Sequence, residues 1–355
     1  MNRRKIILLI IVILIIVFVA LYAFTGSNVI DDVKPKGDVS IAVVGDITFA
    51  KSMSSVLSGG KSPYAGVENV TSKVDLLLIN FENPSTNSSN AVKGDIPFKS
   101  SPEYAKLAKN NNNTVAAIAN NHVFDYGIDG MHDTVNNLKN EGMAVLGAGD
   151  NASQANAPVT QEINGRKITI FNYMDSDNFA EYSNDAIPRA NETSPGFSVY
   201  NSDIATKQIK EAKKNGSDFV LVYFHYGNEY SNSPNENQVK MSHEVIDAGA
   251  DIVLGSHPHV PQGIEMYNGT PIFYSLGNFM FYDLAVSKTR QDYFVEIDLV
   301  NDTAECTVYP VNIVGFLPQF MTPSEGTSLL KSLSPQCDQL QITDAGTGKL
   351  SYKLK

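Results

Sequence analysis

Short apolar runs recur along the chain, and each is followed at once by a polar residue that can bind a metal ion. Runs of this length are typical of strands that are covered on both faces of a sheet. The runs and the polar residues after them are 39–44 with Asp46, 74–79 with Glu82, 114–119 with Asn121, 219–224 with His225, and 253–256 with His257 and His259. The pattern predicts buried strands with chemical groups at their carboxyl ends.

Helical spacing lies between several of these runs. We expect helices over residues 102–109 behind an N-cap at Ser101, over 130–140, and over 202–215 with Gly216 at the end. Strands that alternate with helices favour parallel βαβ units, in which ligand sites gather at the carboxyl ends of the strands. The fold class expected from the pattern is therefore α/β.

The second half of the chain predicts antiparallel strands as well. Asn-Gly pairs at 164–165 and 268–269 are hairpin turn signals, and strands at 293–300 and 306–313 flank a short polar turn. A mixed sheet, or two packed sheets, is therefore expected. Residues 174–200 are predicted to form a long loop, and Pro323 to begin a last helix before a polar tail from Gln336.

The amino terminus predicts a membrane anchor. Residues 6–24 contain no charged residue, glycine or proline, and a run of this length can form a transmembrane helix. Residues 1–5, which precede the run, are basic. The alternative, a cleaved signal peptide, has a shorter apolar core and a small-residue cleavage site. We expect a single-pass protein of the cell membrane, with a cytoplasmic amino terminus, a linker at 25–37 and an extracytoplasmic domain beyond it.

Composition sets the class of protein and excludes one class of partner. The 355 residues are 43% hydrophobic and 18% charged, which suits a large folded core rather than a disordered chain. The net charge of −11 would repel nucleic acids. Cys306 and Cys337 are the only cysteines, and the sequence leaves open whether they form a disulfide.

The strand-end residues form a candidate metal site. A single histidine after a strand is most often a hydrogen-bonded structural residue, but here four of the six histidines fall at strand ends together with two carboxylates. Carboxylate, amide and imidazole ligands suit Mn, Zn or Fe better than calcium. One or two divalent ions are therefore expected, whereas His132 and His243 lie in helical stretches and are predicted to be surface residues.

Six ordered blocks of sequence resemble those of capsule-synthesis proteins of the CapA, poly-γ-glutamate type. The blocks are residues 45–47, 80–82, 119–127, 225–230, 255–262 and 274–279. The resemblance covers residues 38–315 and leaves 316–355 as a carboxyl-terminal helix and tail. It implies a branch of the calcineurin-like metallophosphoesterases, with an α/β/β/α sandwich and a two-metal site.

The resemblance also implies a role for each residue of the site. Asp46 and His259 would bind the first metal, Glu82 would bridge, and Asn121, His225 and His257 would bind the second. His122 would protonate the leaving group, with Asp125 orienting it. Glu229, Tyr230 and Asn278 are candidates for lining the substrate groove or supporting the ligands.

One position departs from the phosphoesterase pattern. That pattern begins Asp-x-His, whereas this chain has Thr48 at the place of the histidine, so the first metal loses an imidazole. The first hypothesis is an anchored metal-dependent hydrolase that acts on a phosphoester or on an amide of an anionic polymer. The second is a non-catalytic assembly or export factor that binds the polymer or its precursor alongside other capsule-synthesis membrane proteins. A sugar- or peptide-binding surface module unrelated to capsule is a third alternative.

Overall fold

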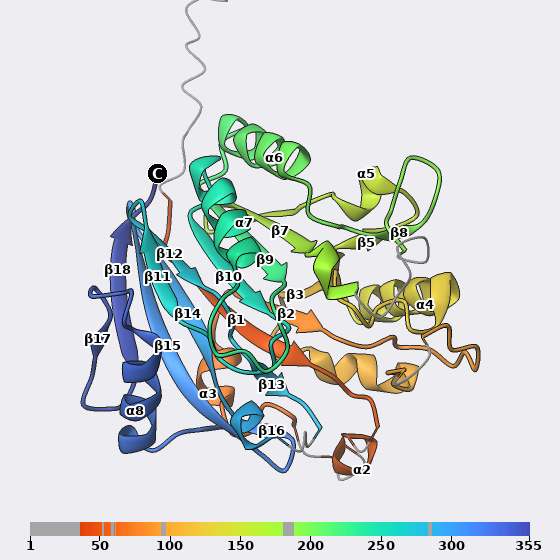
Figure 1. The fold of residues 1–355 in the computed structure, drawn as a ribbon, viewed down its shortest axis with the longest axis horizontal. Coiled ribbons are helices and arrows are strands. Elements are labelled where there is room, and N and C mark those ends of the chain that lie inside the picture. Colours follow the sequence, from red (N-terminus) through yellow and green to blue (C-terminus); the bar gives the residue numbers. More distant parts are fainter. Residues whose placement is uncertain are drawn as a thin grey trace, which may run out of the picture. The chain divides into compact units, whose positions relative to one another are not determined.

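A ten-stranded mixed sheet forms one half of the fold in the described part of the chain (Figure 1). Its strands, in chain order, are β1 (Val39–Ile47), β2 (Leu76–Phe81), β3 (Thr114–Ala117), β4 (Ala144–Leu146), β13 (Asn278–Met280), β14 (Gln291–Val300), β15 (Thr303–Val314), β16 (Leu317–Phe320), β17 (Gln341–Ile342) and β18 (Gly348–Lys353). Strands β1 to β4 are parallel neighbours, and β1 also pairs with β14 in the antiparallel direction. The apolar run after residue 38 therefore becomes a central strand.

A six-stranded sheet forms the other half. It contains β6 (Val159–Ile163), β7 (Arg166–Met174), β9 (Phe219–His225), β10 (Ile252–Ser256), β11 (Ile264–Tyr267) and β12 (Thr270–Phe273). Strands β7, β9, β10 and β12 are parallel, and the two Asn-Gly turns close the hairpins β6–β7 and β11–β12 at its edges. The predictions of these hairpins and of two mixed sheets are confirmed. A short pair, β5 (Ala148–Gly149) and β8 (Gly196–Phe197), lies apart from both.

The two sheets pack face to face over one apolar cluster, and helices cover their outer faces. Val43, Leu78, Leu221 and Leu254 are fully buried in the cluster between the sheets. The outer face of β9 and β10 packs on α6 (Ser202–Lys214) and α7 (Glu236–Asp247), whereas the outer face of β1 to β3 packs on α2 (Met53–Leu57), α3 (Glu68–Thr71) and α4 (Gly127–Asn140). The order of layers is helix, sheet, sheet, helix, as the predicted sandwich requires.

Helix ends follow the capping signals in the sequence. The Asn201 side chain accepts a hydrogen bond from the Ile204 backbone at the start of α6, and Asn235 forms a capping box with Gln238 at the start of α7. Helix α8 (Pro323–Leu333) begins with a capping box of Thr322 and Glu325. The predicted helices after Ser202 and Pro323 are confirmed. A single turn, α5 (Ala152–Ala155), follows β5.

Three expectations from the sequence need correction. Residues Pro102–Ala108 form a 3-10 helix, η1, and Ser101 makes no side-chain cap. The predicted loop at 174–200 contains another 3-10 turn, η2 (Ser176–Phe179), and the short strand β8. A further 3-10 turn, η4 (Ser287–Arg290), lies elsewhere in the chain. The residues after Gln336 are more than a polar tail, because Leu350 and Tyr352 of β18 are buried where that strand pairs with β15.

The computed structural model describes residues 36–51, 53–57, 60, 62–93, 97–179, 188–282 and 286–355. Gly37 to Lys355 form one compact unit. Within the described residues, no helix has the length and apolar character needed to cross a membrane. The predicted basic end, the anchor at 6–24 and nearly all of the linker lie outside the described residues. Cys306 and Cys337 are both buried free thiols, so no disulfide joins them.

Candidate metal centre

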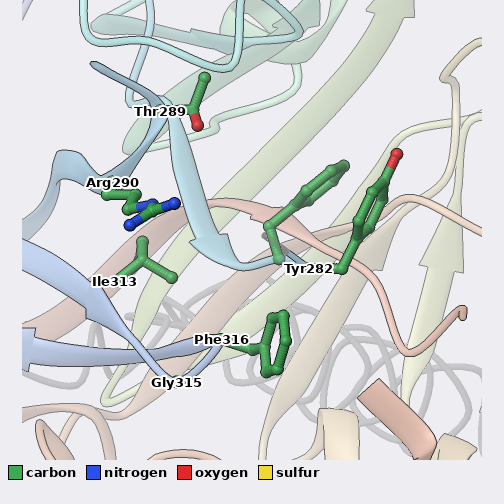
Figure 2. A pocket seen from close by; sticks show the side chains of 7 residues that line it. Tyr282, Thr289, Arg290, Ile313, Gly315 and Phe316 are labelled. Atoms are coloured by element: carbon green, nitrogen blue, oxygen red, sulfur yellow. The ribbon is translucent and has the colours of Figure 1, made fainter. Parts of the chain in front are cut away.

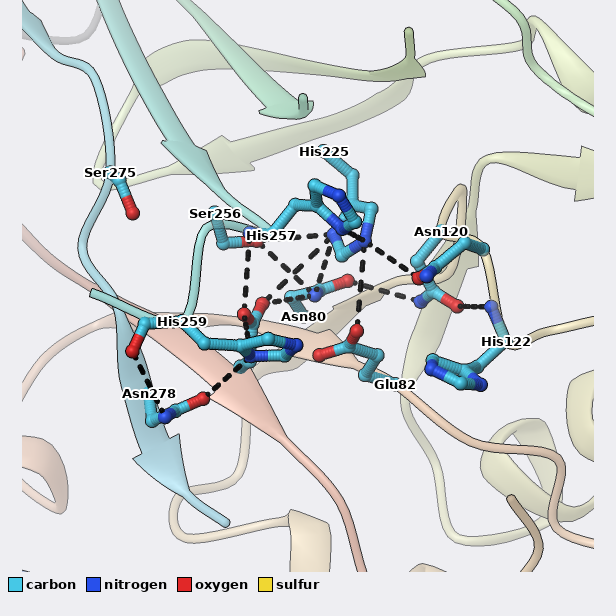
Figure 3. Close-up of polar contacts among 12 residues, drawn as sticks. Asn80, Glu82, Asn120, His122, His225, Ser256, His257, His259, Ser275 and Asn278 are labelled. Atoms are coloured by element: carbon cyan, nitrogen blue, oxygen red, sulfur yellow. Dashed lines mark hydrogen bonds and ion pairs between the residues drawn. The ribbon is translucent and has the colours of Figure 1, made fainter. Parts of the chain in front are cut away.

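The strand ends of both sheets meet at one place, which gathers the candidate ligands. Asp46 lies in β1 next to Asn80 of β2, and His225 ends β9 beside Ser256, the last residue of β10. Figure 3 shows Asn80, His225 and Ser256 pointing toward one another from the two sheets. All eight candidate residues are less than 9% exposed: Asp46, Glu82, Asn121, His122, Asp125, His225, His257 and His259.

Two overlapping groups of side chains have the geometry to hold metal ions. Asp46, Glu82 and His259 form one group, and Glu82, His225 and His257 form the other. Within each group the ligand atoms lie within 4.8 Å of one another. Glu82 belongs to both groups, so its carboxylate lies where a bridging ligand would be needed. The roles drawn from the resemblance remain predictions.

The Glu82 carboxylate is the strongest sign that a cation fits here. Neither of its oxygens has a hydrogen-bond partner among the described residues, although the side chain is fully buried. Burial raises the pKa of Glu82 well above its ordinary value, and the nearby Asp46 charge raises it further. A buried carboxylate without partners is costly, and a bound cation removes that cost.

Asp46 has the opposite environment, because several groups favour its charged form. Its Oδ1 accepts a hydrogen bond from the Asn80 amide at 2.6 Å, and its Oδ2 lies 3.4 Å from Nδ1 of His259. Burial raises the pKa of Asp46, but the hydrogen bond from His259 and the charge of that ring outweigh burial and bring the pKa below its ordinary value. Asp46 is therefore ionised and ready to bind a cation.

His225 lies at the centre of the second group. Its Nε2 is 3.1 Å from Nδ1 of His257 and 3.0 Å from Oδ1 of Asn121, and 3.6 Å from Oε1 of Glu82. Burial lowers the pKa of His225 to about 3, so the ring is neutral at ordinary pH. A neutral imidazole is the form that binds metal ions.

The turn that carries the last two histidines has an unusual backbone. His257 has φ +103° and His259 has φ +56°, a region that residues other than glycine rarely adopt. Backbone of this kind persists only where the surroundings hold it and is common at functional sites. Several contacts hold this turn, among them the hydrogen bond from the Tyr230 N–H to the Pro258 carbonyl at 2.8 Å and that from the His257 N–H to Oδ2 of Asp46 at 3.3 Å. Nδ1 of His259 also lies 3.0 Å from Oδ1 of Asn278.

His122 forms a separate pair with Asp125. Nδ1 of His122 lies 2.7 Å from Oδ2 of Asp125, an oxygen that also accepts the Phe98 N–H at 2.7 Å. Phe98 stacks on the His122 ring, with centroids 3.8 Å apart. Burial lowers the pKa of His122 and raises that of Asp125 to about 7. The carboxyl fixes the ring, so exchange of a proton with a substrate falls to Nε2.

Thr48, Glu229 and Tyr230 are placed differently from the ligands. The Thr48 hydroxyl donates to Oδ1 of Asn83 at 3.0 Å and thus supports the loop after β1. Tyr230 is 41% exposed, and its ring centroid is 6.3 Å from that of His259. Glu229 is exposed beside it. These two residues lie at the mouth of the site rather than among the ligands.

Some contributors to the site were missed from the sequence. Asn80 donates to Asp46 and lies 3.3 Å from Nδ1 of His225, so it positions one ligand of each group. Its place two residues before Glu82, at the end of an apolar run, was a usable signal. Ser256 also lies 3.3 Å from Nδ1 of His225. No sequence pattern pointed to Lys51, Lys93 or Phe98 as part of the site, because these residues lie in loops without periodicity.

The described residues also form a small pocket beside the ligands, because Phe281, one of its lining residues, has its ring centroid 4.7 Å from that of His259. Tyr282, Arg290 and Phe316 are among the residues that line it (Figure 2). It contains no residue that the sequence predicted for the site, and we assign it no function. His132 and His243 are not part of the metal centre, because they pair instead with Asp150 and Glu265.

Comparisons with known proteins identify the family. The chain is 37% identical to the PGA biosynthesis protein CapA of Bacillus subtilis over 84% of this chain and 78% of that protein. It is 32% identical to the capsule biosynthesis protein CapA of Bacillus anthracis over 89% and 78% of the two chains. Among solved structures, the calcineurin-like phosphoesterase YfkN from Bacillus subtilis is 13% identical, with a TM-score of 0.41 over 81% and 89% of the two chains. Residues 40–283 match the model of the bacterial capsule synthesis protein PGA_cap, and the chain belongs to this family.

Proposed function

We propose that the protein is a metal-dependent hydrolase of the capsule synthesis family. The observation that carries the proposal is the buried Glu82 carboxylate, which has no hydrogen-bond partner among the described residues and is shared by two groups of ligand atoms. The substrate is a phosphoester or an amide of an anionic polymer or its precursor. The named relatives act in the biosynthesis of PGA or of capsule, which supports a substrate of this kind.

The side chains of this site would hold one or two divalent ions of Mn, Zn or Fe. When bound, such an ion supplies a Lewis acid and lowers the pKa of bound water. Asp46, Glu82, His225, His257 and His259 would supply the ligand atoms that hold the ion. Asp125 would hold Nδ1 of His122 and stabilise the protonated ring, which would pass the proton on its Nε2 to the leaving group and become neutral.

We further propose that the protein is anchored in the cell membrane by one helix. The support is in the sequence, where the uncharged run at 6–24 follows the basic residues 3–5. The domain from Gly37 onward would then lie outside the cytoplasm, where it meets the polymer and other capsule-synthesis membrane proteins. Added protease should digest the domain in intact protoplasts; complete protection, with digestion after lysis, would contradict this orientation.

Metal analysis of the purified full chain tests the hydrolase. One or two equivalents of Mn, Zn or Fe are expected in the wild type, together with hydrolysis of a phosphodiester or a γ-glutamyl amide. His257→Ala and Asp46→Ala should lower both. His132→Ala is the matched control, because His132 is exposed in α4 and paired with Asp150. A folded wild type that binds no divalent ion and hydrolyses neither substrate would exclude the proposal.

A non-catalytic polymer-binding factor is the alternative function. Thr48 favours this alternative. It stands where the phosphoesterase pattern has a histidine ligand, and its hydroxyl donates a hydrogen bond to Asn83. In this case a strain whose protein lacks the ligand histidines would still display the polymer. Loss of polymer from that strain, with the variant present at normal levels, would instead favour the hydrolase.

A further inference from the structure

A lysine, a phenylalanine and a histidine form a layered contact beside the metal centre. The Lys51 Nζ lies 4.7 Å from the centroid of the Phe98 ring, and the Phe98 ring stacks on His122 at 3.8 Å with an interplanar angle of 1°. Lys51 follows β1, whereas His122 follows β3. The ammonium group is therefore fixed one ring away from the proposed proton donor.

Tyr282 holds the same ammonium group from another side. Its ring centroid is 4.5 Å from the Lys51 Nζ, and its hydroxyl is 3.3 Å from that atom. Contacts of a cation with ring faces restrict the side chain without neutralising its charge. Lys51 remains exposed, so a ligand can reach it. Its backbone has φ +53°, a second sign that this position is set by its surroundings.

Lys93 brings a second positive charge to the same side of the site. Its side chain is buried at 8% exposure, and its backbone N–H donates to the Asp125 carbonyl at 3.4 Å. Burial lowers the pKa of Lys51, the Asp125 carboxylate raises it, and the Lys93 charge lowers it, so the Lys93 ammonium group lies within electrostatic reach of Lys51. An anion bound at the exposed Lys51 ammonium group would be attracted by both positive charges.

The opposite side of the site carries negative charge. Glu229 is exposed and acts electrostatically on His259 and Glu82. The exposed charges of the site are thus polarised, with the Lys51 ammonium group on the His122 side, where Asp125 is buried, and the Glu229 carboxylate on the His259 side. A substrate would be oriented by this asymmetry, because its anionic end is attracted to one side only.

We propose that Lys51 and Lys93 bind an anionic oxygen group, a carboxylate or a phosphate, on the part of the substrate that His122 protonates as it leaves. Phe98 and Tyr282 position Lys51 for this contact. The inference rests on the proposed hydrolase for the direction of the leaving group. It adds a substrate class: the departing fragment itself carries negative charge close to the bond that breaks.

Binding to the full chain tests the inference without requiring turnover. The probes are a γ-linked glutamate tripeptide, its analogue with the α-carboxylates converted to carboxamides, and inorganic phosphate, each titrated by calorimetry. Lys51→Met and Lys93→Met should each weaken tripeptide binding by about tenfold, which is the effect of losing one charge-assisted hydrogen bond. The carboxamide analogue should bind weakly to the wild type and to both variants.

Lys240→Met is the matched control, since Lys240 is an exposed lysine of α7 whose Nζ lies 3.9 Å from Oε1 of Glu244. Weaker binding of phosphate alone in the Lys51 and Lys93 variants would support the inference with phosphate as the group bound. Equal binding by wild type and both variants, or an equal loss in Lys240→Met, would overturn it. Lysine-dependent binding by a chain without metal or turnover would exclude the hydrolase and leave the anion site standing.

Discussion

Nε2 of His225 lies 3.1 Å from Nδ1 of His257, although the two rings come from the ends of different strands, β9 and β10. At this distance a hydrogen bond needs one nitrogen protonated and the other bare. Burial lowers the pKa of both rings, so neither carries a second proton. Two neutral imidazoles can form one such bond, and together with Glu82 they can also share a cation.

Glu82→Gln should stabilise the metal-free protein and remove its response to metal. The buried carboxylate has no hydrogen-bond partner among the described residues, and an amide of the same shape carries no charge to desolvate. We expect the free energy of unfolding in a chelator to rise by about 1–2 kcal/mol. Thermal unfolding with and without Mn²⁺ measures both effects. Glu141→Gln, at an exposed position, is the control, and a less stable metal-free Glu82→Gln would contradict the argument.

Thr48→Val should reduce stability but leave metal content unchanged. The hydroxyl donates to Asn83 at 3.0 Å and also accepts the Ala50 N–H at 3.2 Å, both inside the protein. Removal of these bonds should lower the free energy of unfolding by about 1–2 kcal/mol. Chemical unfolding and metal analysis of the same sample provide the test. Loss of bound metal without loss of stability would show instead that Thr48 supports the first metal directly.

Asp125→Asn should lower kcat much more than it changes KM. The carboxylate accepts from both His122 and the Phe98 N–H, so an amide in its place holds the ring less well and no longer stabilises a protonated imidazole. We expect kcat to fall by about 100-fold. Steady-state kinetics on a phosphodiester measures the effect, with exposed Asp129→Asn as control. Unchanged kcat in Asp125→Asn would remove this pair from the reaction.

Asp298→Asn should flatten the dependence of stability on pH between about 4 and 6. Burial raises the pKa of Asp298 from 3.8 to about 6, with help from Glu296 and Glu305. The folded chain therefore holds this proton more tightly than the unfolded chain, so stability declines as pH rises through that window. Solvent screening keeps the loss below about 1 kcal/mol. Urea unfolding at pH 4 and pH 7 measures the change in the free energy of unfolding between the two pH values. An identical change in the variant and the wild type would refute the assignment of this pH dependence to Asp298.

The order of elements could be predicted from sequence because periodicity and turn residues are local. The runs before Asp46 and His225 became central strands, and both Asn-Gly pairs became hairpin turns. The direction of the Thr48 hydroxyl could not be predicted, because it depends on Asn83 in the next loop. The contact between Lys51 and Phe98 likewise joins distant segments that have no repeating pattern.

Strand β18 shows where a weak signal was overlooked. Its residues alternate between buried and exposed, with Leu350 and Tyr352 inward, which is the period of a strand with one covered face. Six residues between polar neighbours are too few to separate this period from chance. Pairing with β15 decides the structure, and that partner is visible only in the fold.

The pairing of β1 also has a consequence for the order in which the protein is made. Val39 pairs with Leu299, so one edge of the central strand stays open until the ribosome has passed residue 299. Strand β18, which pairs with the other side of β15, is made later still. Contacts this distant in sequence slow folding and expose strand edges to aggregation. Nascent chains should therefore depend on a holding chaperone until β18 has been made, and a carboxyl-terminal truncation before β18 should accumulate as aggregate.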